Sequence, residues 1–468
     1  MIIAGPSTKL ASPRQATPVG REGDATRIAW PMVGLAVLAL SFNGLLAIVN
    51  AHGMALTITH VAAVEAAILA GVAVAVLSRG MREADAPALA LSMAFVVGAL
   101  LMSFINGGLV VEALRNVAIV VLFTMLGIRS NAATIRAAFA VAIALVLGVM
   151  LIEIVSVPLY SGIFNPFSYY LNTRGLGEVD YGDTGLFGNA LGFEGRFSFG
   201  LFTTPRTSSI FVEQTSLANF ASVIAIYLAT MWRRLNWPER VLALGFVALA
   251  LLSNNTRLGS TFAALTLIGY AVYPRLPRAG LLVLPLALIG ASVLLTQQLG
   301  PSKEDDLAGR IGLSMRLLSL TDLQAAIGAR AFEAGKFPDS GYSYVLFSSS
   351  LVGAILLWLY VALIVPYRTP EQRRCAWALA LFLFVNLLVA GNAIFSAKVG
   401  ALLWLLAGFM RVADAGAVAH LPYRAVRRFR SGHDFAGGGT IAAPASTARR
   451  FVRDPIPTGG AMQEGCRS

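Results

Sequence analysis

The chain has 468 residues, of which 57% are hydrophobic and only 13% are charged, and its mean hydropathy is +0.71. Since about a quarter of the residues in a soluble domain are usually charged, this composition excludes an ordinary soluble protein. The net charge of +12 does not indicate nucleic-acid binding, because most Lys and Arg residues lie between apolar runs and in the two tails. The two cysteines, Cys375 and Cys466, fit neither a disulfide framework nor the spacing of a metal site, and we expect no metal or other cofactor.

Apolar runs of membrane-spanning length recur along the chain and predict an all-α polytopic integral membrane protein with about twelve transmembrane helices. The predicted membrane domain covers residues 30–410, between a cytoplasmic N-terminal tail (1–29) and a cytoplasmic C-terminal tail (411–468) that we expect to be largely disordered. The seventh segment is short and the division between the last two is weak, so ten or eleven spans are alternatives. In chain order, the helices are expected at about Trp30–Val49, Thr59–Leu77, Pro87–Ile105, Leu109–Ile128, Ala132–Val157, Ser209–Trp232, Arg240–Leu252, Thr256–Tyr273, Gly280–Thr296, Tyr344–Tyr367, Ala376–Ala390 and Ala393–Met410.

Basic residues are concentrated in alternate connections between these helices and in both tails. The positive-inside rule therefore places both termini in the cytoplasm and requires an even number of spans. The two long connections, at about 158–208 and 297–343, then lie on the outer face. Loops of this length are usually functional or disordered, and their aromatic content argues against disorder. Apolar residues at helical spacing between Leu307 and Phe332 indicate short interfacial helices.

Arg206 and Glu213 lie where the first long connection meets a predicted membrane helix, in the stretch Arg206-Thr-Ser-Ser-Ile-Phe-Val-Glu213. Such a pair is expensive to keep at the mouth of a membrane helix, which makes it a candidate functional site. If the helix already runs through this stretch, the two residues face the same way, about 10 Å apart. The Arg could grip a phosphate, and a partly buried Glu could act as a base. The alternative is an Arg snorkelling at the interface and a Glu that caps the helix.

Four further residues are candidates on the outer face. Arg257, in the turn Asn-Asn-Thr-Arg257-Leu-Gly-Ser, is either a second phosphate ligand or a lone interfacial cation. Arg310 and Arg316, in the second long connection, have either a direct role or belong to a solvated amphipathic face. Asp339, in the turn Asp339-Ser-Gly-Tyr342, has either a role toward the substrate or caps the next helix.

Three other charges lie inside the predicted spans or at their outer ends. They are Arg115, with Glu112 three residues before it, and Lys398. For these residues, internal ion pairing or the lining of a polar cavity is expected rather than catalysis.

The layout of residues 30–410 and three local stretches resemble the bacterial O-antigen ligase and Wzy-type polysaccharide polymerase superfamily, and most closely the exopolysaccharide polymerases of the xanthan type. The three stretches are those that contain Arg206 and Glu213, Arg257, and Asp339. The resemblance implies a glycosyltransferase of the bacterial inner membrane that acts at the periplasmic face. Its substrates would be oligosaccharide repeat units linked through pyrophosphate to undecaprenol, and its partners membrane lipid and the chain-length regulator and flippase of the same pathway.

For such chemistry, the resemblance suggests pyrophosphate binding by Arg206, Arg257, Arg316 and Arg310. Glu213 is the first choice for the catalytic carboxylate, and Asp339 is the second.

One departure from the superfamily bears on the kind of transfer. The ligases depend on a histidine in the second long outer loop, and this loop has none. That difference favours a polymerase over a ligase that acts on lipid A core, and another lipid-linked glycan transferase stays an alternative. A flippase or transporter of the same lipid-linked sugars is the main alternative from another class, but flippases usually have short outer loops and place their charges in a central cavity.

Overall fold

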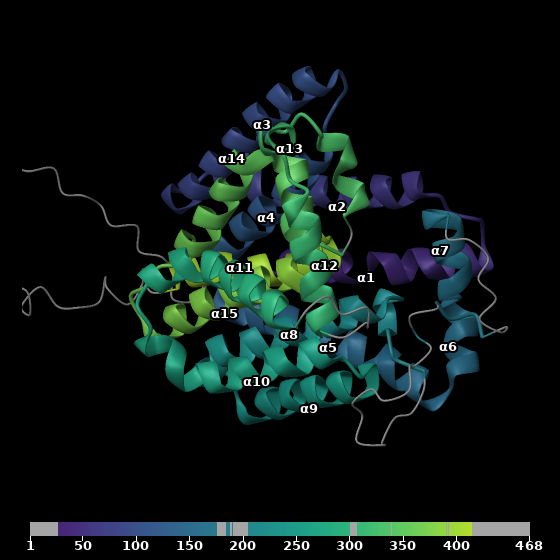
Figure 1. Ribbon diagram of the computed structural model, residues 1–468. Coiled ribbons are helices and arrows are strands. Elements are labelled where there is room, and N and C mark those ends of the chain that lie inside the picture. Colours follow the sequence, from purple (N-terminus) through teal and green to yellow (C-terminus); the bar gives the residue numbers. More distant parts are fainter. Residues whose placement is uncertain are drawn as a thin grey trace, which may run out of the picture. The chain divides into compact units, whose positions relative to one another are not determined.

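The computed structural model describes residues 27–175, 184–187, 190, 205–299, 307–337, 339–389, 391 and 393–413, which all belong to the unit Met1–Ala415 (Figure 1). Most of the predicted tails, including the C-terminal tail expected to be disordered, lies outside these residues. The described residues form helices and connections, without strands. The α-helices are α1 (Trp30–His52), α2 (Ile58–Leu77), α3 (Ala86–Asn106), α4 (Glu112–Ile128), α5 (Ala132–Val155), α6 (Val157–Phe164), α7 (Pro166–Arg174), α8 (Gln214–Met231), α9 (Trp237–Asn254), α10 (Arg257–Val272), α11 (Ala279–Leu299), α12 (Leu307–Ser319), α13 (Leu323–Ala326), α14 (Gly341–Leu363), α15 (Pro370–Val389) and α16 (Ala397–Val412). The 3-10 helices are η2 (Glu83–Asp85), η4 (Ser209–Phe211), η5 (Trp232–Arg234), η6 (Tyr273–Arg275), η7 (Ala331–Lys336) and η8 (Ala393–Phe395).

Within the described part of the chain, eight helices are long and apolar enough to cross a membrane: α1, α2, α3, α5, α8, α11, α14 and α15. Each of the other four predicted spans also coincides with a helix, namely α4, α9, α10 and α16, but these helices are shorter or less apolar. The all-helical architecture and the repeated apolar helices agree with a polytopic membrane protein.

Helices α8 and α9 differ from their predicted bounds, and one weakly predicted division is confirmed. Helix α9 is longer than the expected segment, because it begins at Trp237 behind an Asn236 cap and continues to Asn254. The weakly predicted division between the last two segments is confirmed, since α15 and α16 are separated by the short helix η8. Helix α8 begins only at Gln214, because Ser209 and Val212 have positive φ angles, which an α-helix does not allow.

The most buried helices form the centre of the bundle. Helix α16 is buried along nearly its whole length and packs against α4, where the two backbones nearly touch. A Cβ atom on Gly408 would lie only 1.9 Å from the carbonyl oxygen of Thr124, so a larger residue would force these helices apart. Helices α2 and α11, by contrast, leave most of their apolar side chains exposed, as expected for helices that face lipid.

The two long connections contain short helices that dock on the bundle. In the first, α6 and α7 pack against α1 (Figure 1), and beyond this connection α8 packs against both α9 and α10. In the second, α12 lies over the ends of α10, α14 and α15. It is attached there by a small apolar cluster that includes Ile311, Met315, Leu388 and Val389. Both connections therefore meet the bundle at the helix ends where the candidate residues lie.

Candidate functional site at the ends of α8, α10 and α16

Arg206 is held against the turn between α9 and α10. Its Nε donates a hydrogen bond to the backbone carbonyl of Asn254 at 2.7 Å, and its Nη2 lies 3.4 Å from the Oδ1 of the same residue. Asn254 is fully buried and its Nδ2 also donates to the carbonyls of Thr207 at 2.6 Å and Gln214 at 2.9 Å. This one side chain therefore ties the segment that follows Arg206 to the first residue of α8.

Arg257 lies three residues beyond Asn254 and is the first residue of α10. Its side chain is exposed, and the hydroxyl of Thr256 caps the helix by accepting from the backbone N–H of Gly259 at 3.5 Å. Arg206 therefore contacts the turn that leads into α10, and Arg257 is the first residue of that 16-residue helix. Two arginines beside a helix N-terminus form an arrangement that favours an anion such as a phosphate.

Glu213 and Arg206 are not on one helical face, because the segment between them is a 3-10 turn rather than an α-helix. Glu213 occupies the N-cap position of α8, yet its side chain does not cap the helix. Its carboxylate is instead paired with the ammonium of Lys398 from α16 and with Arg174 from α7 at 3.5 Å, and it accepts from the hydroxyl of Ser216 at 2.8 Å. The cations paired with Glu213 are therefore Lys398 and Arg174, whereas the sequence suggested Arg206.

These neighbours determine the charge of Glu213. Burial by itself would raise the pKa of this carboxyl group, but the charges of Lys398 and Arg174 and the hydrogen bonds from Lys398 and Ser216 lower the pKa from an ordinary 4.5 to about 2. Glu213 is therefore ionised at neutral pH and accepts a proton poorly while both cations are in place. It would become a stronger base if one of its cations moved away.

Arg174 is the more exposed of these two cations. Its side chain is 44% exposed, whereas that of Lys398 is 5% exposed. The guanidinium of Arg174 stacks over the ring of Tyr170, 4.4 Å from the ring centre. Helix α7 is fixed to α1 by the hydroxyl of Tyr169, which donates to Asn43 at 3.0 Å. Arg174 thus reaches Glu213 from a well-anchored helix through an exposed side chain.

The remaining predicted residues lie around α12. Arg310 and Arg316 are exposed on this helix, and Asp339 is exposed in the turn before α14. The hydroxyl of Ser314 donates to the backbone carbonyl of Asp339 at 3.2 Å, so the structure joins α12 to this turn. Arg316 also borders a groove of about 410 Å³ between α11 and α12, whose other lining residues are Val293, Thr296, Gln297, Gly312, Met315 and Ser319. Leu258, next to Arg257, packs on the apolar cluster beneath α12.

Arg115 and Lys398 form ion pairs inside the bundle, as predicted, but the partner of Arg115 is not the expected one. Arg115 binds Glu65 of α2 through two hydrogen bonds, at 2.7 and 3.0 Å, rather than its sequence neighbour Glu112. Glu112 instead accepts from the hydroxyl of Tyr344 at 2.8 Å, and Asn116 donates to the same hydroxyl at 2.8 Å. The sequence could not indicate Glu65 as the partner, because it lies 50 residues away on another helix.

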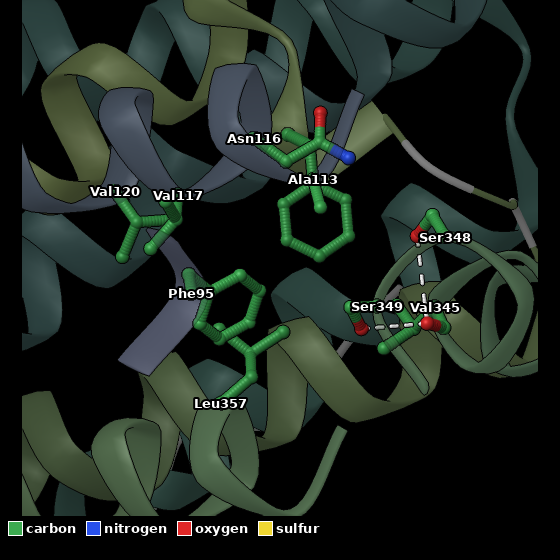
Figure 2. A pocket seen from close by; sticks show the side chains of 10 residues that line it. Phe95, Ala113, Asn116, Val117, Val120, Val345, Ser348, Ser349 and Leu357 are labelled. Atoms are coloured by element: carbon green, nitrogen blue, oxygen red, sulfur yellow. Dashed lines mark hydrogen bonds between the residues drawn. The ribbon is translucent and has the colours of Figure 1, made fainter. Parts of the chain in front are cut away.

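A cavity beside Asn116 is too small to hold a substrate. Figure 2 shows it between Phe95, Asn116 and Val345, and it has room for about 10 Å³, roughly one water molecule. The hydroxyls of Ser348 and Ser349 are turned to the carbonyl of Val345 (Figure 2). The candidate site is therefore the polar cluster around Glu213 and Asn254, not this cavity.

The sequence predicts Arg206, Glu213 and Arg257 as site residues but does not indicate the residues that contact Arg206 and Glu213. Asn254 lies in the turn Asn-Asn-Thr-Arg257, but the sequence suggests no role for it. Arg174 lies in no motif that would indicate a contact with Glu213. Among the described residues, no group of three or more His, Cys, Asp or Glu side chains could hold a metal ion. Comparisons of the chain with protein-family models, with curated proteins and with solved structures found no match.

Proposed function

We propose that this protein polymerises oligosaccharide repeat units linked to undecaprenyl pyrophosphate into an exopolysaccharide, at the periplasmic face of the bacterial inner membrane. The observation that carries the proposal is that the buried Asn254 binds Arg206 and the carbonyl of Gln214, the residue after Glu213, and lies three residues before Arg257. Two cations at a helix N-terminus suit a pyrophosphate leaving group, and a carboxylate nearby suits an acceptor hydroxyl.

The proposed topology has twelve spans, both termini in the cytoplasm, and the connections at about 158–208 and 297–343 in the periplasm. Eight helices with the length and hydropathy of membrane spans support it, as does the concentration of basic residues in alternate connections. The site then lies at the membrane surface, where the pyrophosphate of a lipid carrier would be found while its isoprenoid chain stays in the bilayer.

In the proposed reaction, a hydroxyl oxygen of one repeat unit attacks the anomeric carbon of another. The bond from this carbon to the pyrophosphate oxygen breaks, and undecaprenyl pyrophosphate leaves with the electron pair. Arg206 and Arg257 stabilise the developing negative charge, with Arg316 and Arg310 on α12 as additional cations. This neutralisation is the largest catalytic effect we assign to the protein.

The proton of the attacking hydroxyl goes to a carboxylate. We assign it to Glu213, which becomes a stronger base when the exposed Arg174 turns from Glu213 toward the pyrophosphate. Lys398 is buried and remains beside Glu213 throughout. Asp339, exposed at the turn that binds α12, is the second carboxylate for this role.

The test compares Arg206→Ala and Glu213→Gln with the control Arg136→Ala. The control removes a partly exposed cation near the N-terminus of α5, which pairs with Glu239. Each variant is produced in cells that make the polymer, and the lipid-linked sugars on each membrane face are analysed. We expect single repeat units to accumulate on the periplasmic face in the first two variants, and normal polymer in the control.

Full-length polymer in both site variants would contradict the proposed site. Accumulation of repeat units on the cytoplasmic face would indicate a flippase instead. Loss of transfer to a different lipid acceptor, with polymer length unchanged, would indicate a ligase.

A further inference from the structure

Glu153 is a carboxyl group buried inside the apolar helix α5, with only 1% of its surface exposed. Its two oxygens accept hydrogen bonds from the backbone N–H of Ser208 at 2.9 and 3.0 Å, from the hydroxyl of Ser208 at 3.1 Å, and from the backbone N–H of Ser209 at 2.6 Å. A buried carboxyl group in a membrane helix is costly, and it is retained where it has a specific task. Ser208 and Ser209, which donate these hydrogen bonds, lie in the segment that separates Arg206 from Glu213.

That segment has an unfavourable backbone conformation. Ser209 and Val212 both have φ angles of 53°, although neither is a glycine, and Val212 is β-branched. Such conformations persist only where the surroundings determine them. The hydroxyl of Tyr160 supplies a second restraint, since it donates to the carbonyl of Ser209 at 2.7 Å and lies 2.9 Å from the hydroxyl of Ser208.

A third restraint comes from the side chain of Ser209, whose hydroxyl donates to the carbonyl of Val146 at 2.7 Å. Helices α5 and α6 thus bind the two serines from one side. Because Ser208 follows Arg206 by two residues and Ser209 precedes Glu213 by four, a shift of these serines would move both charged residues.

We infer that Glu153 is a positioning residue, which holds Ser208 and Ser209 so that Arg206 and Glu213 keep their separation and orientation. This inference rests on the proposed function, because it assigns Glu153 a role in the same transfer reaction. Glu153 does not touch the substrate; it acts through the segment that carries the two charged residues.

The experiment uses the purified full chain in lipid vesicles, with synthetic lipid-pyrophosphate-linked repeat units, and measures turnover per folded enzyme. Glu153→Met removes both acceptor oxygens while keeping the length of the side chain. Glu153→Gln keeps one oxygen for the two backbone N–H groups, and its amide N–H can donate to the hydroxyl of Ser208. We expect turnover to fall more than tenfold in Glu153→Met and to be partly restored in Glu153→Gln.

A double variant separates positioning from general destabilisation. If Glu153 acts through the segment that carries Arg206, the loss in Arg206→Ala with Glu153→Met will be smaller than the product of the two single losses. The control is Asp85→Met, which removes an equally buried carboxylate that binds Arg129 at 2.8 Å, at the opposite end of α4 from Glu112. We expect this control to reduce the amount of folded protein but not the turnover per folded enzyme.

Wild-type turnover in folded Glu153→Met, while Arg206→Ala is inactive, would overturn the inference without affecting the proposed function. Multiplicative losses in the double variant would also overturn it, because they would indicate independent effects. Unchanged turnover in Arg206→Ala and in Glu213→Gln would instead refute the proposed function. If Glu153→Met does not fold, Tyr160→Phe takes its place, since it removes only the hydroxyl that holds the same two serines, and the same tests apply.

Discussion

The ion pair between Lys398 and Glu213 gives the sharpest prediction about stability. It joins α16 to the start of α8, and the two side chains are 5% and 19% exposed. Replacing Lys398 with Met keeps the volume of the side chain but leaves a buried carboxylate without its nearest cation. Replacing Glu213 with Gln leaves a buried ammonium without its anion.

The magnitude follows from what remains after each substitution. Removing one partner of a buried ion pair usually costs about 3–5 kcal/mol, because the other charge stays buried. Lys398→Met should cost less than this, about 2–3 kcal/mol, since Arg174 and Ser216 still contact Glu213. Glu213→Gln should cost about 3–5 kcal/mol. The double variant leaves neither charge and should cost about 1–3 kcal/mol, so the coupling energy is at least about 2 kcal/mol.

The assay is the free energy of unfolding in mixed micelles, measured for the wild type, the two single variants and the double variant. The matched control is the pair of Arg136 and Glu239, whose side chains are 30% and 27% exposed and whose coupling should be about 0–1 kcal/mol. Equal coupling energies for the two pairs would refute the reasoning. So would strictly additive effects of the substitutions at Lys398 and Glu213.

Three further predictions concern the same region. The stability that the ionised Glu213 contributes is complete above about pH 4.5 and is lost as the pH falls toward 2, because its pKa is lowered in the folded state. The unfolding temperatures of the wild type and Glu213→Gln, measured across this range, should therefore converge at low pH. Asn254→Ala leaves two buried carbonyls and Arg206 without their amide partner and should reduce the free energy of unfolding by about 2–4 kcal/mol; an unchanged value would show that this contact is dispensable. Gly44→Ala places a Cβ atom 2.4 Å from the carbonyl oxygen of Ile210 and should lower polymer synthesis by displacing the segment that contains Ile210, whereas wild-type synthesis would show that the segment tolerates movement.

The sequence alone determined the helices, because hydropathy and helix-forming residues act over one stretch of chain. Each of the twelve predicted segments coincides with a helix, and even the weak division between α15 and α16 is real. The same local reasoning failed between Arg206 and Glu213, where the apolar side chains continue but the backbone turns at Ser209 and Val212. Hydropathy records how apolar a segment is, and it does not record the φ angles that contacts with other helices impose.

The partners of the charged residues were decided only by the tertiary structure. The sequence singles out Arg206 and Glu213 as costly charges, but Glu213 is paired with Lys398, 185 residues away, and Arg206 is bound to Asn254. In the same way, Arg115 binds Glu65 on another helix rather than Glu112, three residues before it. A charge in an apolar helix indicates that a partner must exist, because an unpaired buried charge is too costly. Which residue supplies that partner depends on how the helices pack, and the sequence of one segment does not contain this information.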